Sequence, residues 1–243
     1  MCFGPVASFT AAGILTAIGS AVLKNVRARK EIFLALFPLL FAVQQFTEGW
    51  LWLLLRSGKS GVLQQGLTFT FLIFAYVIWP VLCPVSVYAI EYNHRRRRLL
   101  LLLIFMGICT SSYLLFFIFK NSIQAVALTC QIRYETHLSR AYLFTGVYMV
   151  ATILPYFLSS HRAILIFGIP NLIFCIIAYF FYNFAFTSVW CFFAAIISVS
   201  FYFFLRRLHH QPLLPIRLIQ ENKWRPFIAF RTKGSASKVS FFR

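Results

Sequence analysis

The sequence predicts an all-α membrane protein, a polytopic bundle of about seven transmembrane helices. Of its 243 residues, 60% are hydrophobic and 12% are charged, whereas a soluble domain averages roughly 45–50% and about 25%. The apolar residues come in runs of about eighteen or more, the length that a helix needs to cross a bilayer. Because lipid offers no partners for backbone N–H and C=O groups, each run is expected to be helical.

Seven apolar segments have the length of a membrane-spanning helix. They cover Ala7–Leu23, Ile32–Leu55, Leu67–Ile90, Leu99–Phe119, Ala141–Leu158, Ala163–Phe181 and Phe184–Leu205. We therefore expect one membrane domain over residues 1–208 and a basic tail over residues 209–243.

The distribution of Lys and Arg predicts the orientation of these spans. Eighteen of the 23 basic residues fall on one side of the membrane, within residues 24–30, within 95–98, at Arg162 and from Arg206 to Arg243. The other side receives five, which are Arg56, Lys59, Lys120, Arg133 and Arg140. By the positive-inside rule, the N-terminus lies outside and the C-terminus lies in the cytoplasm, in a cell (inner) membrane.

The same distribution bears on binding partners. Although the formal net charge is +18, the basic residues flank apolar runs, so nucleic acid is not an expected partner. The tail mixes Lys and Arg with aromatic residues from Trp224 to Phe242, a pattern suited to anionic inner-leaflet lipids. A solvated, disordered tail is the open alternative, and association into a homo-oligomer also stays open.

No cofactor or metal site is expected. The six cysteines are scattered without CxxC spacing. Among the histidines only His137 falls on the outer side, so they cannot form one cluster. Cys2 and Cys130 both fall on the outer side, where a disulfide depends on the compartment.

Glu48 is an acidic residue deep inside the second span. A charged carboxylate at the bilayer centre costs about 2.5–3.5 kcal/mol on insertion scales. Glu48 is therefore expected to face the bundle interior, to be protonated or to have a basic partner. Gln44 and Trp52 lie one helical turn to either side of it on the same face.

We interpret this region as an outward-facing polar pocket around Glu48. Its expected residues are Gln44, Gln45, Glu48, Trp52, Arg133, Tyr134, His137 and Arg140. The alternative is an ion pair in which Glu48 meets one arginine and clamps two helices together. The outer loop from Asn121 to Ser139 contains an apolar stretch, Ile123–Ile132, which is expected to form a short interfacial or re-entrant helix and is a candidate lid.

The third span carries Pro80 and Pro84, one helical turn apart. Each proline removes a backbone donor and frees a carbonyl. This pattern predicts a kink, and we treat the two residues as a candidate hinge.

Several short motifs resemble those of an uncharacterised bacterial membrane family whose members usually begin Met-Cys-Phe-Ser. The matches are Met1-Cys2-Phe3, Pro38-Leu39-Leu40-Phe41-Ala42, Gln44-Gln45, Glu48-Gly49, Trp52, Ile132-Arg133-Tyr134, Ser159-Ser160-His161-Arg162 and Trp190-Cys191-Phe192-Phe193-Ala194-Ala195. The resemblance covers most of the membrane domain and implies the fold and a bacterial origin, but no activity. Gly4 departs from the usual serine, and Gln131 stands in place of a histidine.

Three classes of function follow from the polar pocket. A carrier of a small solute, or a proton-linked carrier, is the first, because an intramembrane ionisable residue is a functional candidate by default. An intramembrane enzyme acting on lipids is the second, with Glu48, His137 and Cys2 as its acid, base or ligand candidates. A sensor or assembly protein without turnover is the third. No catalytic motif assigns the chain to the enzymes, and its catalytic residues stay unknown.

Overall fold

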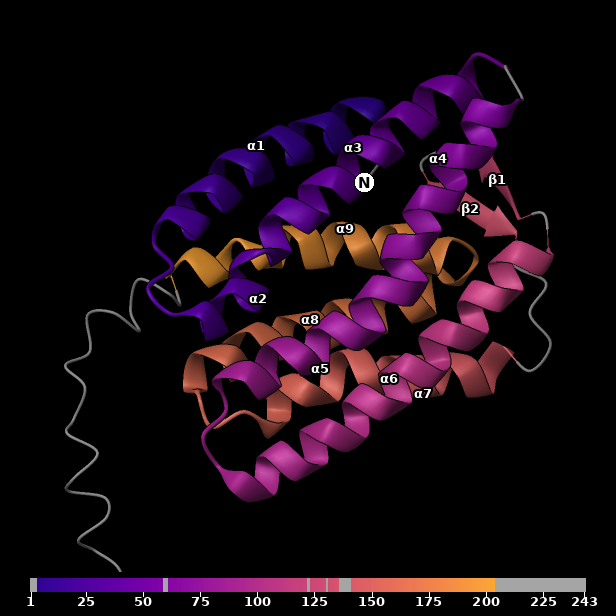
Figure 1. Ribbon diagram of the computed structural model, residues 1–243. Coiled ribbons are helices and arrows are strands. Elements are labelled where there is room, and N and C mark those ends of the chain that lie inside the picture. The colour runs from indigo at the N-terminus through magenta and orange to yellow at the C-terminus, as the bar shows by residue number, and fades with distance from the viewer. Residues whose placement is uncertain (1–3, 59–60, 122, 130, 136–140, 204–243) are drawn as a thin grey trace, which may run out of the picture. The chain divides into compact units, whose positions relative to one another are not determined.

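The computed structural model describes residues 4–58, 61–121, 123–129, 131–135 and 141–203, with the backbone alone over 141–144. Its helices and strands are shown in Figure 1. The helices are α1 (Pro5–Lys24), α2 (Ile32–Ala35), α3 (Phe37–Arg56), α4 (Val62–Ile73), α5 (Trp79–Ile90), α6 (His94–Lys120), α7 (Ala141–Leu158), α8 (Arg162–Phe181) and α9 (Phe186–Ser198). Shorter elements are the 3-10 turns η1 (Arg29–Glu31) and η3 (Asn183–Ala185), the π-helical turn η2 (Phe74–Ile78), and the strands β1 (Gln124–Ala127) and β2 (Ile132–Glu135).

Six helical stretches in the described part of the chain are long and apolar enough to cross a membrane. They are Pro5–Lys24, Arg29–Arg56, Val62–Ile90, His94–Lys120, Arg162–Phe181 and Asn183–Phe203. The apolar part of α7, Thr145–Leu158, is shorter. A multi-pass helical membrane bundle is thus confirmed. Six of the seven expected spans overlap these stretches, and the expected span Ala141–Leu158 coincides with α7.

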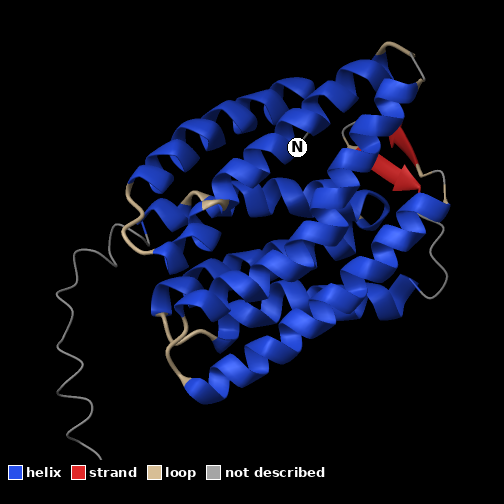
Figure 2. Ribbon diagram, viewed as in Figure 1, coloured by secondary structure: helices blue, strands red, loops and turns tan. Residues whose placement is uncertain are grey.

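The linkers fall at two opposite ends of the bundle. Figure 2 shows that the linkers from α1 to α2, from α5 to α6 and from α7 to α8 lie together at one end. The hairpin and the turn from α3 to α4 lie at the other end. The first end carries the basic residues at 24–30, 95–98 and 162. The linkers that are rich in Lys and Arg therefore lie together at one end of the bundle.

Small residues allow α1 to pack closely on α3. A Cβ atom on Gly19 would lie 2.6 Å from Leu39 Cδ2, and one on Gly49 would lie 2.8 Å from Phe9 Cε1. Close backbone approach at small residues is a common basis of helix association in lipid. The glycines therefore fix α1 against the outer face of α3.

The third span is irregular where α4 meets α5. The π-helical turn η2 directly precedes Trp79-Pro80, and carbonyls within it accept hydrogen bonds from neighbouring helices. The hydroxyl of Tyr148 donates to Ala75 O at 2.6 Å, and Ser111 Oγ donates to Val77 O at 2.9 Å. Other helices thus satisfy backbone groups freed in this stretch, as lipid requires.

The expected helix over Ile123–Ile132 is wrong, because this segment contributes to an antiparallel hairpin. Strand β1 pairs with β2 so that Gln124 faces Glu135 and Ala127 faces Ile132. The Leu128 amide donates to Gln131 O at 2.8 Å and closes the turn. Alternate residues of a strand point to opposite faces, so Ile132 and Tyr134 share the buried face of β2.

Candidate functional site

The inward face of α3 gathers the polar residues that the sequence singled out. Gln44, Gln45, Glu48 and Trp52 are each at most 2% exposed. Their spacing of three or four residues places them on one side of the helix. The opposite side of α3 is apolar and exposed, so the polar face points into the bundle, as predicted.

Glu48 is held by a side chain from the last helix. The hydroxyl of Ser188 on α9 donates a hydrogen bond to Glu48 Oε1, and Gln45 lies beside the carboxyl without the geometry of a hydrogen bond. Within the residues that the structure describes, Glu48 forms no ion pair. Arg133 pairs instead with Glu135, with 2.6 Å between Arg133 Nη2 and Glu135 Oε1.

Gln44 joins the site to the irregular third span. Its carbonyl oxygen accepts a hydrogen bond of 3.0 Å from Trp79 Nε1. That bond fixes which end of the amide faces Trp79, so the amide nitrogen points elsewhere and interacts with the sulfur of Cys191. The residues before Pro80 thus touch the site directly.

Five buried polar atoms at this site have no hydrogen-bond partner in the described part of the chain. They are Gln44 Nε2, Gln45 Nε2, Gln45 Oε1, Trp52 Nε1 and Tyr134 Oη. Leaving a buried donor or acceptor unsatisfied costs about 1–3 kcal/mol. Buried polar groups are normally satisfied, so a cluster of exceptions requires an explanation such as a bound ligand or ion.

The hairpin covers one end of this cluster. The ring of Tyr134 stacks on Phe71 with centroids 4.8 Å apart, and Ile132 and Ala125 belong to the same apolar core as Trp52. Burial raises the pKa of the Tyr134 phenol well above its ordinary value, and the nearby Glu48 carboxyl adds to this effect. The phenol therefore stays protonated beside Glu48, and the hairpin closes the site.

The remaining predicted pocket residues lie elsewhere. Arg133 and Glu135 are half-buried and share the face of β2 opposite to Tyr134, so Arg133 is not brought to Glu48. Both His137 and Arg140 lie outside the described residues. Alternation along β2 separates Arg133 from Tyr134, and this follows only once the segment is known to be a strand.

A small cavity lies deeper in the bundle, next to the polar cluster. Its volume is about 30 Å³, and its walls are mainly aromatic. The lining residues are Phe37, Phe41, Trp79, Cys83, Tyr148, Thr152, Tyr156, Phe167, Asn171, Trp190, Cys191 and Ala194. Since a water needs roughly 10–15 Å³ of such space, the cavity has room for one or two waters.

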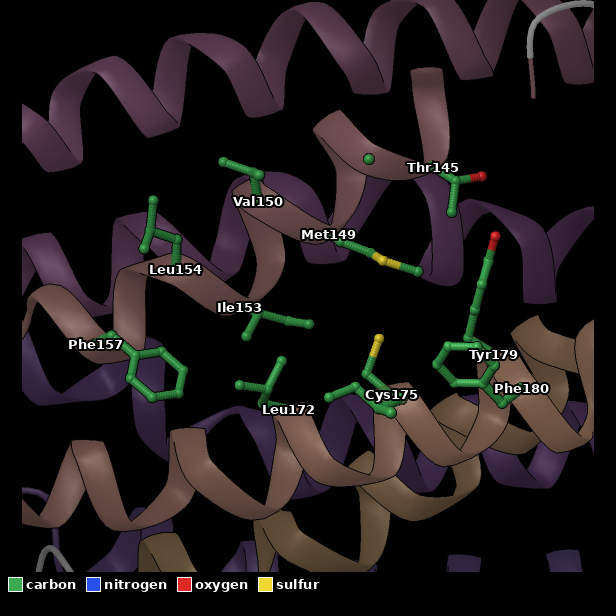
Figure 3. Close-up of a pocket in the computed structure, with 12 residues that line it drawn as sticks. Thr145, Met149, Val150, Ile153, Leu154, Phe157, Leu172, Cys175, Tyr179 and Phe180 are labelled. Carbon is green, nitrogen blue, oxygen red and sulfur yellow. The ribbon is translucent and has the colours of Figure 1, made fainter. Parts of the chain in front are cut away.

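A larger groove runs between α7 and α8, and nothing in the sequence indicated it. It has a volume of about 570 Å³ and is almost entirely apolar. Figure 3 shows Thr145 and Tyr179 at one end and Phe157 at the other, with Met149, Ile153 and Cys175 between them. An almost entirely apolar groove on a helical membrane bundle suits acyl chains.

A second buried carboxylate, Glu91, ties two linkers together at the end of the bundle that carries the basic residues. Its oxygens accept hydrogen bonds from Ser160 N and Ser160 Oγ at 2.7 Å, and from the amides of Tyr92 and Asn93. Burial acts to raise the pKa of Glu91, but these hydrogen bonds outweigh it and lower the pKa below its ordinary value. This arrangement gives the Ser-Ser-His-Arg motif a structural role, because Ser160 joins the linker from α7 to α8 to the linker from α5 to α6. We call the contact between Glu91 and Ser160 the Glu91 clasp.

Metal-binding side chains do not gather in the described residues. No group of three His, Cys, Asp or Glu residues within them is placed to hold a metal ion. Of the three enzyme candidates, Cys2 and His137 lie outside the described residues, and Glu48 stands among amides and aromatic rings.

These features define a multi-pass helical membrane protein with a buried polar site. The chain belongs to a family of unknown function (DUF6629), whose model matches residues 1–213. The expected membership of an uncharacterised family is thereby confirmed. No curated protein and no solved structure matches the chain.

Proposed function

We propose that the protein is a carrier of a small polar solute, with Glu48 at the centre of an occluded binding site. The observation that carries this proposal is the cluster of unpaired polar atoms around a buried carboxyl. A ligand that satisfied Gln44, Gln45, Trp52 and Tyr134 would remove the cost of leaving them unpaired. In the proposed topology, seven spans place the N-terminus outside and the C-terminus in the cytoplasm of a bacterial inner membrane.

The surroundings of the site suit alternating access. Carriers often bind their solute near the bilayer midplane beside interrupted helices, and Trp79 reaches Gln44 from just after the π-helical turn η2. The hairpin closes one end of the bundle, and the Glu91 clasp closes the other. We propose Pro80 and Pro84 as the hinge that lets the third span move between two states.

The basic tail, residues 209–243, lies outside the described residues. Its binding to anionic inner-leaflet lipids stays part of the proposal. Flotation of the chain with and without residues 211–243 on vesicles of phosphatidylglycerol and phosphatidylcholine tests it. If truncation leaves the phosphatidylglycerol dependence unchanged, the tail has no such role.

The test of the carrier proposal is uptake into proteoliposomes. The solute panel spans sugars, amino acids, carboxylates and monovalent cations, each compared between the wild type and Glu48→Gln. A matched control is Glu135→Gln, which removes a carboxylate that pairs with Arg133 on the other face of the hairpin. We expect at least one solute to enter with the wild type and with Glu135→Gln but not with Glu48→Gln. Equal uptake by a well-folded Glu48→Gln protein would overturn the proposal.

A further inference from the structure

We infer that the Glu48 site exchanges one proton for one small monovalent cation, so that the carboxyl holds one or the other in every step. The inference rests on the proposed carrier function and names its solute class. It comes from two observations, the lack of a basic partner in the described residues and the oxygen groups around the carboxyl.

The elements packed against α3 bring no described positive charge to Glu48. On α9 the neighbouring groups are Ser188 and Cys191, and on β2 the neighbouring group is Tyr134. Helices α2 and α4 and strand β1 carry no ionisable side chain, and in the described part of α1 only Lys24, at its last residue, is ionisable. On α3 itself, Arg56 lies eight residues further along, over the ring of Trp52.

Charge balance then selects the ligand. An ionised carboxylate buried without a partner is strongly disfavoured in a medium of low dielectric constant. A proton removes the charge, and so does a bound monovalent cation. An anion would place a second, uncompensated negative charge beside Glu48, and a neutral solute gives the carboxyl no reason to release its proton.

The groups around Glu48 suit a small cation. Besides the carboxylate, the unpaired Gln45 Oε1 and the Ser188 hydroxyl offer oxygen ligands, which hard cations prefer. Unpaired N–H groups of Gln44 and Trp52 can bind waters that the cation keeps. The cavity of about 30 Å³ that Trp79 and Cys191 line has room for one or two such waters.

Exchange is tested with proteoliposomes that contain a trapped pH indicator. The vesicles are loaded with NaCl, LiCl or KCl and diluted into isosmotic choline chloride, with sucrose-loaded vesicles as the neutral case. We expect outflow of at least one cation to acidify the interior, because each departing cation is replaced by a proton. Exchange of one charge for one is electroneutral, so holding the membrane voltage at zero with valinomycin and equal potassium on both sides should leave the Na⁺- or Li⁺-driven rate unchanged.

The variants separate failure of this inference from failure of the carrier proposal. Glu48→Gln should reduce acidification to the rate of protein-free vesicles, Glu48→Asp should restore part of it, and Glu135→Gln should match the wild type. Glu48-dependent uptake of a neutral or anionic solute without proton movement would overturn cation exchange and leave the carrier proposal standing. No Glu48-dependent flux of any solute, from variants that elute and melt like the wild type, would overturn both.

Discussion

The hydroxyl of Ser188 on α9 donates a hydrogen bond to the carboxyl of Glu48 on α3, joining residues that lie 140 positions apart in the sequence. Both side chains are at most 2% exposed. The contact connects the second span to the last one at the depth of the polar cluster. It also gives Glu48 a neutral partner in place of the arginine that the sequence suggested.

Ser188→Ala should weaken both stability and Glu48-dependent flux. A polar contact between membrane helices contributes about 0.6–2 kcal/mol, and the loss should appear as a lower Tm in detergent. Ser198→Ala is the matched control on the same helix, because Ser198 is equally buried but donates to Ala195 O within α9. A loss as large in Ser198→Ala as in Ser188→Ala would show that the contact with Glu48 adds nothing.

Gly107→Ala should destabilise the protein more than any other Gly→Ala change. A Cβ atom at Gly107 would lie 2.1 Å from the carbonyl oxygen of Pro80, and backbone cannot move aside as a flexible side chain can. Overpacking of this kind costs about 1–3 kcal/mol or more. Gly13→Ala is the control, since nothing lies within 4 Å of its added Cβ. Comparison of Tm for the two variants tests the close approach of α6 to α5, and equal values would contradict it.

Much of the fold could be predicted because a helix that crosses a bilayer must be about 20 residues long and mostly apolar. Most expected boundaries lie within a few residues of the observed ones. The larger differences are at Leu67, where the helix already begins at Val62, and at Leu99, where α6 begins at His94, while Leu205 lies outside the described residues. The hairpin could not be predicted in the same way. Its strands have four residues each, and a short apolar run reads equally well as strand or helix.

The sequence predicted the α3 half of the candidate site and Tyr134, but not Ser188. Helical spacing alone places Gln44, Glu48 and Trp52 on one face. Ser188 lies among apolar residues of α9. Its role could not be predicted from its neighbours in the sequence, because its partner Glu48 lies on another helix. Arg133 was expected at Glu48 since charges of opposite sign attract, but strand alternation turns its side chain to the other face.

Glu91→Gln should destabilise the end of the bundle that carries the clasp, in a pH-dependent way. The folded state lowers the pKa of Glu91, so the ionised carboxylate contributes stability that is complete above its ordinary pKa of 4.5 and disappears as the pH falls through the lowered value. Hydrogen bonds to charged groups contribute about 1.5–3 kcal/mol. The Tm of wild type should therefore exceed that of Glu91→Gln at pH 7, and the gap should narrow below about pH 4. A gap that is constant with pH would contradict the role of the charge.

Tyr134→Ala should open the site to water at the hairpin end. In a Gln45→Cys background, the thiol replaces a fully buried side chain beside Glu48 and should react slowly with a water-soluble methanethiosulfonate reagent. Removing the ring that stacks on Phe71 should speed the reaction, whereas Tyr134→Phe keeps the ring and should leave it slow. Chains without Gln45→Cys give the background from native cysteines. If Tyr134→Ala and Tyr134→Phe label at the same rate, the hairpin does not close the site, and the path to Glu48 must lie elsewhere.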